Sequence, residues 1–356
     1  MRWAKIRPRV TYDLASSGLS AVSTRELLGD ALAKDAFEIS GPNDEGLMQL
    51  RDAIAARYGM SSDRVAIAPG ASGANFLALF SLLQPGDDVL IERPAYDPLI
   101  GAARAAGANV IHFERGWNKG FALDAGAVSS VLTPATRLIV ISNAHNPSGA
   151  LAERAALEEI GAMAGANGAH VLVDEVYAEA QHDASAAPVT AAKLGDAFVV
   201  TNSLTKAFGL AGLRCGWVLA SRDVAEQVRI TRDIVDGSGP FVTERLALTA
   251  FAGIDRLRAR ARSILETNFG RLRAMVESNS RLEWVPPAAG TTAFPRVRGV
   301  ADTSTFVDRL VGEYDTIVVP GRYFQAPEHI RVSFGGKPEM FKEALSRLDR
   351  ALNSLS

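Results

Sequence analysis

One lysine of this chain lies in a segment that is otherwise short of charge. Lys206 belongs to the run SLTKAFGLAGLRCGW, residues 203–217, where its neighbours are small or apolar and Arg214 follows eight positions later. Apolar surroundings and a nearby cation both lower the pKa of a lysine, and the neutral amine is then a nucleophile that can form a Schiff base. The alternative is a lysine whose stem packs on apolar residues while its ammonium reaches water.

Two loops upstream of this lysine could bind a phosphate and hold an amide in place. PGASGAN, residues 69–75, follows the apolar run VAIA and leads into an apolar helix, so the N–H groups of Ala71 and Ser72 could bind an anion. NAHNPSG, residues 143–149, follows RLIVIS, and Asn146 is kept out of helical geometry by the proline after it. Taken singly, each loop is better explained as a structural turn, with Ser72 as a helix cap.

A third loop supplies a carboxylate and a phenol. In HVLVDEVY, Asp174 directly follows a run that would be buried on both faces of a sheet, and Tyr177 comes three residues later. A carboxylate there is either paired or exposed at the edge of the sheet, and a helix cap is the simpler alternative. If all these loops share one site, a phosphate cradle, a carboxylate, a phenol and an imine-forming lysine match the requirements of pyridoxal phosphate (PLP).

The elements between these loops predict that they do meet. From about residue 65 to 220, short β-rich runs alternate with Ala- and Leu-rich helical stretches, which is typical of a mainly parallel sheet with helices on both faces. Reactive groups in such sheets collect where strands end. Beyond residue 222 the pattern changes to long amphipathic helices, the breaker-rich VPPAAGT and short strand candidates at TIVVP and IRVSF, which predict a smaller α+β domain.

The order of the motifs resembles one known family. The chain looks like a class I/II aminotransferase of the fold type I PLP-dependent enzymes, and the resemblance rests on GASGAN, RPAY, HNPSG, DEVY, SLTKAFGLAGLRCG and HIRVSFG. It implies an α/β fold with a mainly parallel sheet of the seven-stranded type. It also implies a large PLP-binding domain at residues 40–245, and a small α+β domain built from residues 1–39 and 246–356.

The resemblance implies roles around the cofactor ring. Lys206 would form the Schiff base with PLP and later move the α-proton of the substrate, and Asp174 would pair with the pyridine nitrogen. Tyr177 and Asn146 would hydrogen-bond the 3-oxygen of the ring, and Tyr96 of RPAY would stack on its face. Lys206, Asp174 and Tyr177 are therefore the predicted catalytic residues. Either tyrosine could instead be a half-buried aromatic of the core.

The resemblance also predicts which residues bind the phosphate of the cofactor and the carboxylate of the substrate. The resemblance assigns the phosphate to Ala71, Ser72, Ser203 and Arg214, and it places Gly70 among the cofactor-binding residues. It assigns the α-carboxylate of the substrate to Arg331, with Asn146 beside it, because a planar guanidinium binds a carboxylate in bidentate fashion. The simpler alternatives are a helix-packing stem for Arg214 and an edge-strand salt bridge for Arg331.

The chain departs from the family pattern at three places. Many members place a tyrosine five residues before the glycine of a G-L-x-x-L-R segment, where it reaches the partner subunit's phosphate, and here that position is Gly41. SSGLSA, residues 16–21, is the only candidate for the N-terminal arm that covers the substrate. Where relatives often offer an arginine for a dicarboxylate side chain, Asp233 and Asp236 occur, which suggests a pocket for a basic or polar amino acid.

The composition of the chain limits the classes of binding partner that can be expected. With 47% hydrophobic residues among 356, the chain can bury a core large enough for two lobes, and 38 basic against 40 acidic residues favour neither nucleic acid nor a membrane surface. The single cysteine, Cys215, and the absence of an apolar leader or membrane segment predict a cytoplasmic protein. The five histidines show no metal-ligand spacing, so no metal is expected.

Three functions remain open on these grounds. The first is a homodimeric PLP-dependent aminotransferase that moves an amino group between an L-amino acid and a 2-oxo acid. The second is a PLP-dependent β/γ-lyase or cyclase of the same fold, because the same residues serve all these reactions. The third, a non-catalytic ligand sensor, is disfavoured because every catalytic position is filled and no DNA-binding helix-turn-helix precedes residue 37.

Overall fold

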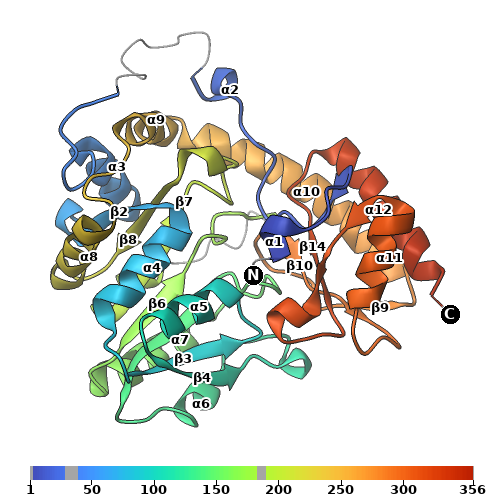
Figure 1. The fold of residues 1–356 in the computed structure, drawn as a ribbon, viewed down its shortest axis with the longest axis horizontal. Helices are drawn as coiled ribbons and strands as arrows, with labels where there is room; N and C mark the ends of the chain where they lie inside the picture. Colours follow the sequence, from blue (N-terminus) through green and yellow to red (C-terminus); the bar gives the residue numbers. More distant parts are fainter. Residues whose placement is uncertain (1–2, 29–38, 183–189, 356) are drawn as a thin grey trace.

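A seven-stranded sheet organises the larger part of the molecule (Figure 1). The computed structural model describes residues 3–28, 39–182 and 190–355. The strands, in their order across the sheet, are β2 (Val65–Pro69), β8 (Cys215–Leu219), β7 (Phe198–Ser203), β6 (His170–Asp174), β5 (Thr136–Ser142), β3 (Asp88–Arg93) and β4 (Asn109–Glu114). All neighbouring strands are parallel except β8, which is antiparallel to both β2 and β7. The predicted mainly parallel α/β sheet is confirmed.

Helices cover both faces of this sheet, because its strands are apolar on both sides. In β5, Leu138 and Val140 belong to one buried cluster and Ile139 and Ile141 to another. The first face is covered by α4 (Gly70–Leu82), α5 (Asp97–Ala105) and α8 (Arg222–Val235). The second is covered by α3 (Met48–Tyr58), α6 (Ala125–Ser129), α7 (Arg154–Ala166) and α9 (Phe241–Ala252). The alternation of strand side chains therefore builds two apolar layers on one sheet.

A second group of elements lies beside the sheet. Its strands are β1 (Tyr12–Asp13), β9 (Leu282–Glu283), β10 (Thr292–Ala293), β11 (Arg296–Val297), β12 (Thr316–Ile317), β13 (Val319–Pro320) and β14 (Ile330–Ser333). They form a three-stranded sheet, β10-β14-β13, and two pairs, β1-β12 and β11-β9. Its helices are α10 (Ile254–Ser278), α11 (Ser304–Tyr314) and α12 (Pro338–Asn353), while α1 (Trp3–Ile6) and α2 (Thr24–Leu28) are short helices near the N-terminus.

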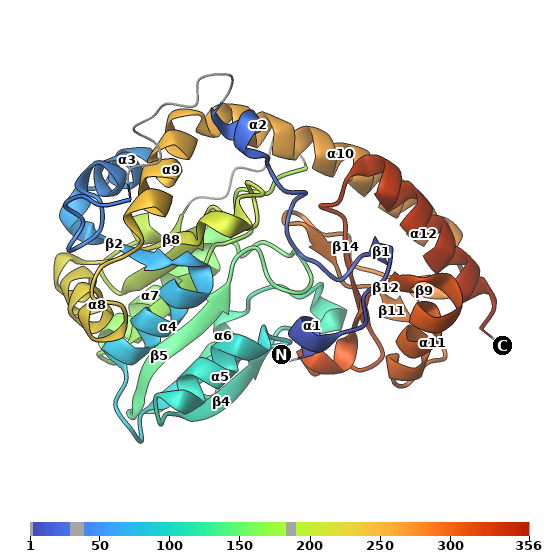
Figure 2. The same cartoon turned by 45° about the horizontal axis from the view of Figure 1, so that its top comes forward.

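The N-terminal segment pairs with the C-terminal part of the chain. β1 pairs in parallel with β12, about 300 residues later in the chain. Figure 2 shows α10 extending from the side of the sheet to this second group. We retain the two-domain division as a proposal, noting that its boundary after residue 245 falls inside α9. Residues 29–38, which that division assigns to the smaller domain, lie outside the described residues.

The helical region after residue 240 is interrupted once. The sequence predicts one long amphipathic stretch from residue 244 to 279, whereas α9 ends at Ala252 and α10 begins at Ile254. Gly253 lies between them with φ −110° and ψ 19°, which is not helical geometry. Glycine is a poor helix former, which is consistent with the break between the two helices at this residue.

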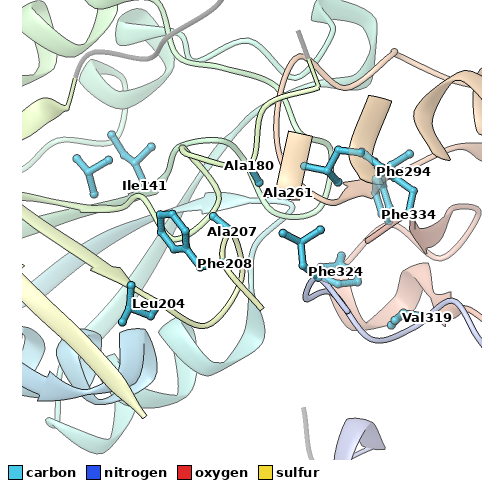
Figure 3. Packing of buried hydrophobic residues seen from close by; sticks show 14 of the residues in the cluster. Ile141, Ala180, Leu204, Ala207, Phe208, Ala261, Phe294, Val319, Phe324 and Phe334 are labelled. Atoms are coloured by element: carbon cyan, nitrogen blue, oxygen red, sulfur yellow. The ribbon is translucent and has the colours of Figure 1, made fainter. Parts of the chain in front are cut away.

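One apolar core joins the sheet to the second group. Figure 3 shows Ile141, Leu204 and Phe208 on the sheet side and Phe294, Phe324 and Phe334 on the other, within a single buried cluster. The strand that carries Arg331 is therefore packed on the same core as the strand ends that carry the other predicted site residues. Among the residues that the structure describes, no helix is long and apolar enough to cross a membrane.

Strand β8 is the strand of the seven-stranded sheet that the sequence did not predict. CGWVL contributed only to a family motif, because a five-residue run with glycine inside it gives a weak strand signal. In the structure Gly216 of β8 pairs with Ala68 of β2 and Ser203 of β7. A Cβ at Gly216 would lie 2.7 Å from Cα of Gly70, where α4 begins. The glycine therefore allows β8 to pass directly under the loop that was predicted to bind phosphate.

We expect Gly216→Ala to lower the free energy of unfolding by about 1–3 kcal/mol, because the added methyl would overpack against the Gly70 backbone. Gly270→Ala is the matched control: it lies within α10, and a Cβ there would meet no described residue within 4 Å. Since alanine is the better helix former, that variant should gain about 0.5–1 kcal/mol. Urea unfolding of the three proteins checks both signs, and equal stability of Gly216→Ala and the parent would contradict the close approach.

Candidate active site

The carboxyl ends of four strands meet at one edge of the sheet. β5, β6 and β7 are parallel, and β2 runs the same way because β8 is antiparallel to both β2 and β7. Three of these strands end on polar side chains, Ser142, Asp174 and Ser203, and α4 begins at Gly70, directly after β2. Topology alone therefore brings residues from four separate loops to one place.

A cavity of about 620 Å³ opens at this edge. It is lined by Ala71, Ser72, Asn75, Tyr96, Pro98, Ser142, Asn146, Asp174, Val176, Tyr177, Ser203, Thr205, Lys206, Ala211 and Arg214. All the predicted site residues are among them except Gly70 and Arg331. Each of those two contacts a residue of the lining: Gly70 lies beside Arg214, and Arg331 donates a hydrogen bond to Asn146.

Lys206 lies in the loop between β7 and β8, within the cavity. Its Nζ donates a hydrogen bond to Oγ of Ser17 at 3.0 Å. The backbones of the two segments are also hydrogen-bonded, because Leu19 N–H donates to the Lys206 carbonyl at 3.2 Å. The segment SSGLSA, the candidate N-terminal arm, therefore lies against the lysine.

Asp174 is a buried carboxyl group, 5% exposed, at the end of the central strand β6. Burial raises its pKa, while hydrogen bonds from Asn75 and the Val176 N–H and the charge of Lys206 oppose that shift. Asn75 Nδ2 donates to Oδ2 at 2.8 Å and Val176 N–H donates to Oδ1 at 3.0 Å. Because a buried carboxylate is costly without a cation, this group favours a positively charged partner in the cavity.

Two phenols line the cavity as hydrogen-bond donors. Burial raises the pKa of Tyr96 to about 12. Burial also raises the pKa of Tyr177, although the charge of Arg331 opposes the shift. Both side chains are therefore protonated at neutral pH and able to donate.

Arg331 lies on β14, with its side chain 4% exposed and directed at Asn146. Nη1 donates to Oδ1 of Asn146 at 3.2 Å and Nη2 donates to the Ala15 carbonyl at 3.0 Å. Its Nε is buried and has no hydrogen-bond partner among the described residues. Burial lowers the pKa of this guanidinium, and an anion would compensate its charge. The arrangement fits a substrate carboxylate.

The other end of the cavity offers donors for a phosphate. α4 begins at Gly70, so N–H groups at its first turn lack partners within the helix. Gly70 has φ +77°, and a Cβ there would lie 2.8 Å from Cζ of Arg214. The guanidinium of Arg214 donates to the Pro69 carbonyl at 3.1 Å and to Oγ1 of Thr205 at 3.4 Å. The glycine therefore leaves room for the arginine beside the helix start.

The sequence analysis missed a buried ion pair behind the site. Arg115 Nη1 donates to Glu92 Oε2 at 2.8 Å, and both side chains are almost completely buried. Glu92 Oε1 accepts from Ser142 N at 2.7 Å and from Ser142 Oγ at 2.5 Å, and Ser142 Oγ accepts from Asn146 N–H at 3.0 Å. Burial raises the pKa of Glu92, and the Arg115 charge opposes that shift. This chain of contacts fixes the Asn146 loop at the strand end.

Asn75, Ser142 and Thr205 also line the cavity without having been predicted. Asn75 carried the clearest signal, because it is an amide within the otherwise apolar run that follows GASGA. Ser142 and Thr205 belong to motifs already singled out, but serine and threonine are common in turns and give little functional signal alone.

For two of the three departures from the family pattern, the structure shows the surroundings of the residues concerned, Gly41 and Asp236. A Cβ at Gly41 would lie 2.5 Å from Cε2 of Phe241, so a tyrosine at this position would require that ring to move. Asp233 and Asp236 do not line the cavity, and Asp236 instead accepts from Nε of Arg232 at 3.1 Å. The preference for a basic or polar substrate therefore stays a prediction without support from the cavity of this chain.

Comparison with known proteins assigns the fold and the site to a family. The family model for aminotransferase class I and II matches residues 12–348. Capreomycidine synthase of Streptomyces vinaceus is 33% identical over 341 residues, covering 92% of this chain and 86% of the synthase. The chain belongs to the class I and II aminotransferase family of fold type I enzymes.

Two solved structures share the whole architecture. A PLP-dependent aminotransferase from Streptococcus suis superposes with a TM-score of 0.91 at 28% identity, covering 98% of this chain and 94% of that one. The PLP-dependent cyclase OrfR superposes with a TM-score of 0.88 at 28% identity, covering 99% and 95%. Family membership implies PLP as the cofactor.

The residues of the cavity fit that cofactor. Helix-start N–H groups and Arg214 suit its phosphate, and a protonated ring nitrogen would add a cation beside the buried Asp174 carboxyl, which the charge of Lys206 already favours in its ionised form. Lys206 lies in the same cavity as an amine for the aldehyde. Among the described residues, no group of three or more His, Cys, Asp or Glu side chains could hold a metal ion.

Glu175, the neighbour of Asp174, should make the stability of the folded protein depend on pH. Burial raises its pKa from 4.5 to about 7, although the Ala191 N–H donates to its Oε1 at 2.7 Å. Between these pH values the folded chain holds a proton that the unfolded chain has released. The free energy of unfolding should therefore fall as pH rises from about 4.5 to 7, by about 3 kcal/mol in total from this group.

Urea unfolding of the cofactor-free protein between pH 5 and 7.5 tests this expectation. Glu175→Gln should have a flatter pH profile than the parent, because glutamine does not titrate. Glu158→Gln, an exposed change on α7, should keep the parent profile. Identical profiles for Glu175→Gln and the parent would show that Glu175 is not the titrating group.

Proposed function

We propose that this protein is a PLP-dependent aminotransferase that moves an amino group between an L-amino acid and a 2-oxo acid. The observation that carries the proposal is the convergence of Lys206, Asp174 and the Arg331–Asn146 pair on one cavity. Lys206 Nζ is the amine that binds the aldehyde of the cofactor. When bound, the cofactor supplies an electron-withdrawing ring that makes the α-proton of the amino acid acidic.

Each remaining residue has a defined task in this proposal. Arg331 binds the substrate α-carboxylate and orients the Cα–H bond, with Asn146 holding the guanidinium. Lys206 Nζ, released when the amino group of the substrate takes its place on the cofactor, would then remove the α-proton as a general base and return it one carbon away as a general acid. The buried Asp174 carboxylate keeps the proton on the ring nitrogen.

Binding of the cofactor is distributed over the rest of the cavity. Tyr177 and Asn146 would donate hydrogen bonds to the ring oxygen, and Tyr96 would pack on the ring face. The phosphate would be bound by residues at the start of α4, at the end of β7 and directly before β8: Gly70, Ala71, Ser72, Ser203 and Arg214. We also propose a homodimer, since active sites of the resembling family are completed across a subunit interface.

A second candidate is a cyclase or lyase reaction on the same cofactor. It is favoured by the similarity to capreomycidine synthase and to the cyclase OrfR. Lys206, Asp174 and Arg331 would bind and deprotonate the amino acid in the same way, so the two reactions differ only after the α-proton is removed. Incubation with single amino acids separates them. An oxo acid and the pyridoxamine form of the cofactor indicate transamination, whereas a cyclised or eliminated product without pyridoxamine indicates the alternative.

We expect Lys206→Ala to lose at least about 10³-fold in kcat for oxo-acid formation, because no other amine replaces it as base. The variant should also lose the absorbance band of the lysine-bound cofactor. Lys342→Ala, an exposed change on α12, is the control and should keep both properties. Turnover of Lys206→Ala close to that of the parent would remove the lysine from the mechanism.

Arg331→Lys should weaken binding of the amino acid by about 10- to 100-fold, because an ammonium cannot form the bidentate pair with a carboxylate. The loss should appear in KM for every amino acid that is turned over, since the α-carboxylate is common to all. Arg298→Lys, on the exposed side of the smaller group of strands, is the control. An unchanged KM in Arg331→Lys would assign the substrate carboxylate to another residue.

A further inference from the structure

Asn75 occupies a position from which it controls the orientation of Asp174. Leu172 of β6 and Val199 of β7 belong to the buried cluster under α4. Because side chains alternate along a strand, Asp174 and Thr201, each two residues further on, face the same helix. Asn75, on α4, lies between them, and it is 5% exposed.

Two hydrogen bonds define how the amide is oriented. Asn75 Nδ2 donates to Asp174 Oδ2 at 2.8 Å, and Thr201 Oγ1 donates to Asn75 Oδ1 at 2.5 Å. A carboxylate only accepts, so the amide nitrogen must face Asp174, and the amide oxygen is then free to accept from the threonine. Thr201 is fully buried and pairs with Asp174 across neighbouring strands. The three side chains therefore form one ordered chain of donors and acceptors.

We propose that Asn75 and Thr201 are positioning residues that hold the Asp174 carboxylate charged and directed at the ring nitrogen of the cofactor. This proposal rests on the proposed function, which gives Asp174 that partner. The Val176 N–H already fixes Oδ1, so the donor from Asn75 satisfies the second oxygen of a carboxylate that is almost completely buried. Thr201 acts one step further out, because it prevents the amide from turning its oxygen toward the carboxylate.

The test follows the protonation of the ring nitrogen in the cofactor-loaded protein. With ¹⁵N-labelled PLP, the nitrogen chemical shift reports the proton as a function of pH, independently of turnover. We expect Asn75→Leu to move this titration downward by about one to two pH units, because one hydrogen bond to the charged carboxylate is lost. Thr201→Val should give a smaller shift in the same direction, and the double variant should shift no further than Asn75→Leu alone.

Asn167→Leu is the matched control. Its amide donates to the Thr133 and Thr136 carbonyls, at the start of β5 and thus at the opposite edge of the sheet. That variant should lose stability without moving the nitrogen titration. If Asn75→Leu does not fold, Thr201→Val alone carries the test, and a parent-like titration of Thr201→Val would then overturn the proposal.

Asp174→Asn distinguishes failure of this inference from failure of the proposed function. If Asp174→Asn moves the titration while Asn75→Leu and Thr201→Val match the parent, the positioning role is wrong and the role of Asp174 stands. If Asp174→Asn itself matches the parent, Asp174 is not the partner of the ring nitrogen and both proposals fall.

Discussion

The buried carboxylate of Asp174 is the constraint around which the site is arranged. It ends the central strand of a sheet whose two faces are covered, so little of its surface is left for water to solvate. Its charge must therefore be compensated by hydrogen bonds and by a cation inside the cavity. Asn75 and the Val176 N–H meet the first need, and a cofactor with a protonated ring nitrogen would meet the second.

A second buried charge balances the site from the other group of elements. Arg331 is held by Asn146 and by the carbonyl of Ala15, directly before the N-terminal arm, so the Asn146 loop, the N-terminal segment and β14 depend on one another. The apolar core that runs from the sheet to β14 supports this arrangement mechanically (Figure 3). A substrate carboxylate would join the same network, which connects binding to the packing of both parts of the chain.

Most of the elements and loops that the sequence predicted correctly were predicted from short-range patterns of hydrophobic and turn residues. The β-rich runs predicted between residues 65 and 220 and the motif loops after them follow from local hydrophobic runs and turn residues, and the structure contains them. The strand β8 gave a weak signal because of Gly216, and the break at Gly253 interrupts a helical pattern that continues on both sides. The Glu92–Arg115 ion pair could not be predicted from the sequence, because its residues are 23 positions apart and belong to no common motif.

The sequence by itself determined the fold class, the family and which residue types stand at the strand ends, because these depend on local periodicity and on the order of motifs. Only the tertiary structure decided which side chains touch. It placed Asn75 and Thr201 on Asp174, Ser17 on Lys206 and Phe241 against Gly41. Such contacts join residues up to about 200 positions apart, and they depend on strand register and on the packing of helices, which no local pattern encodes.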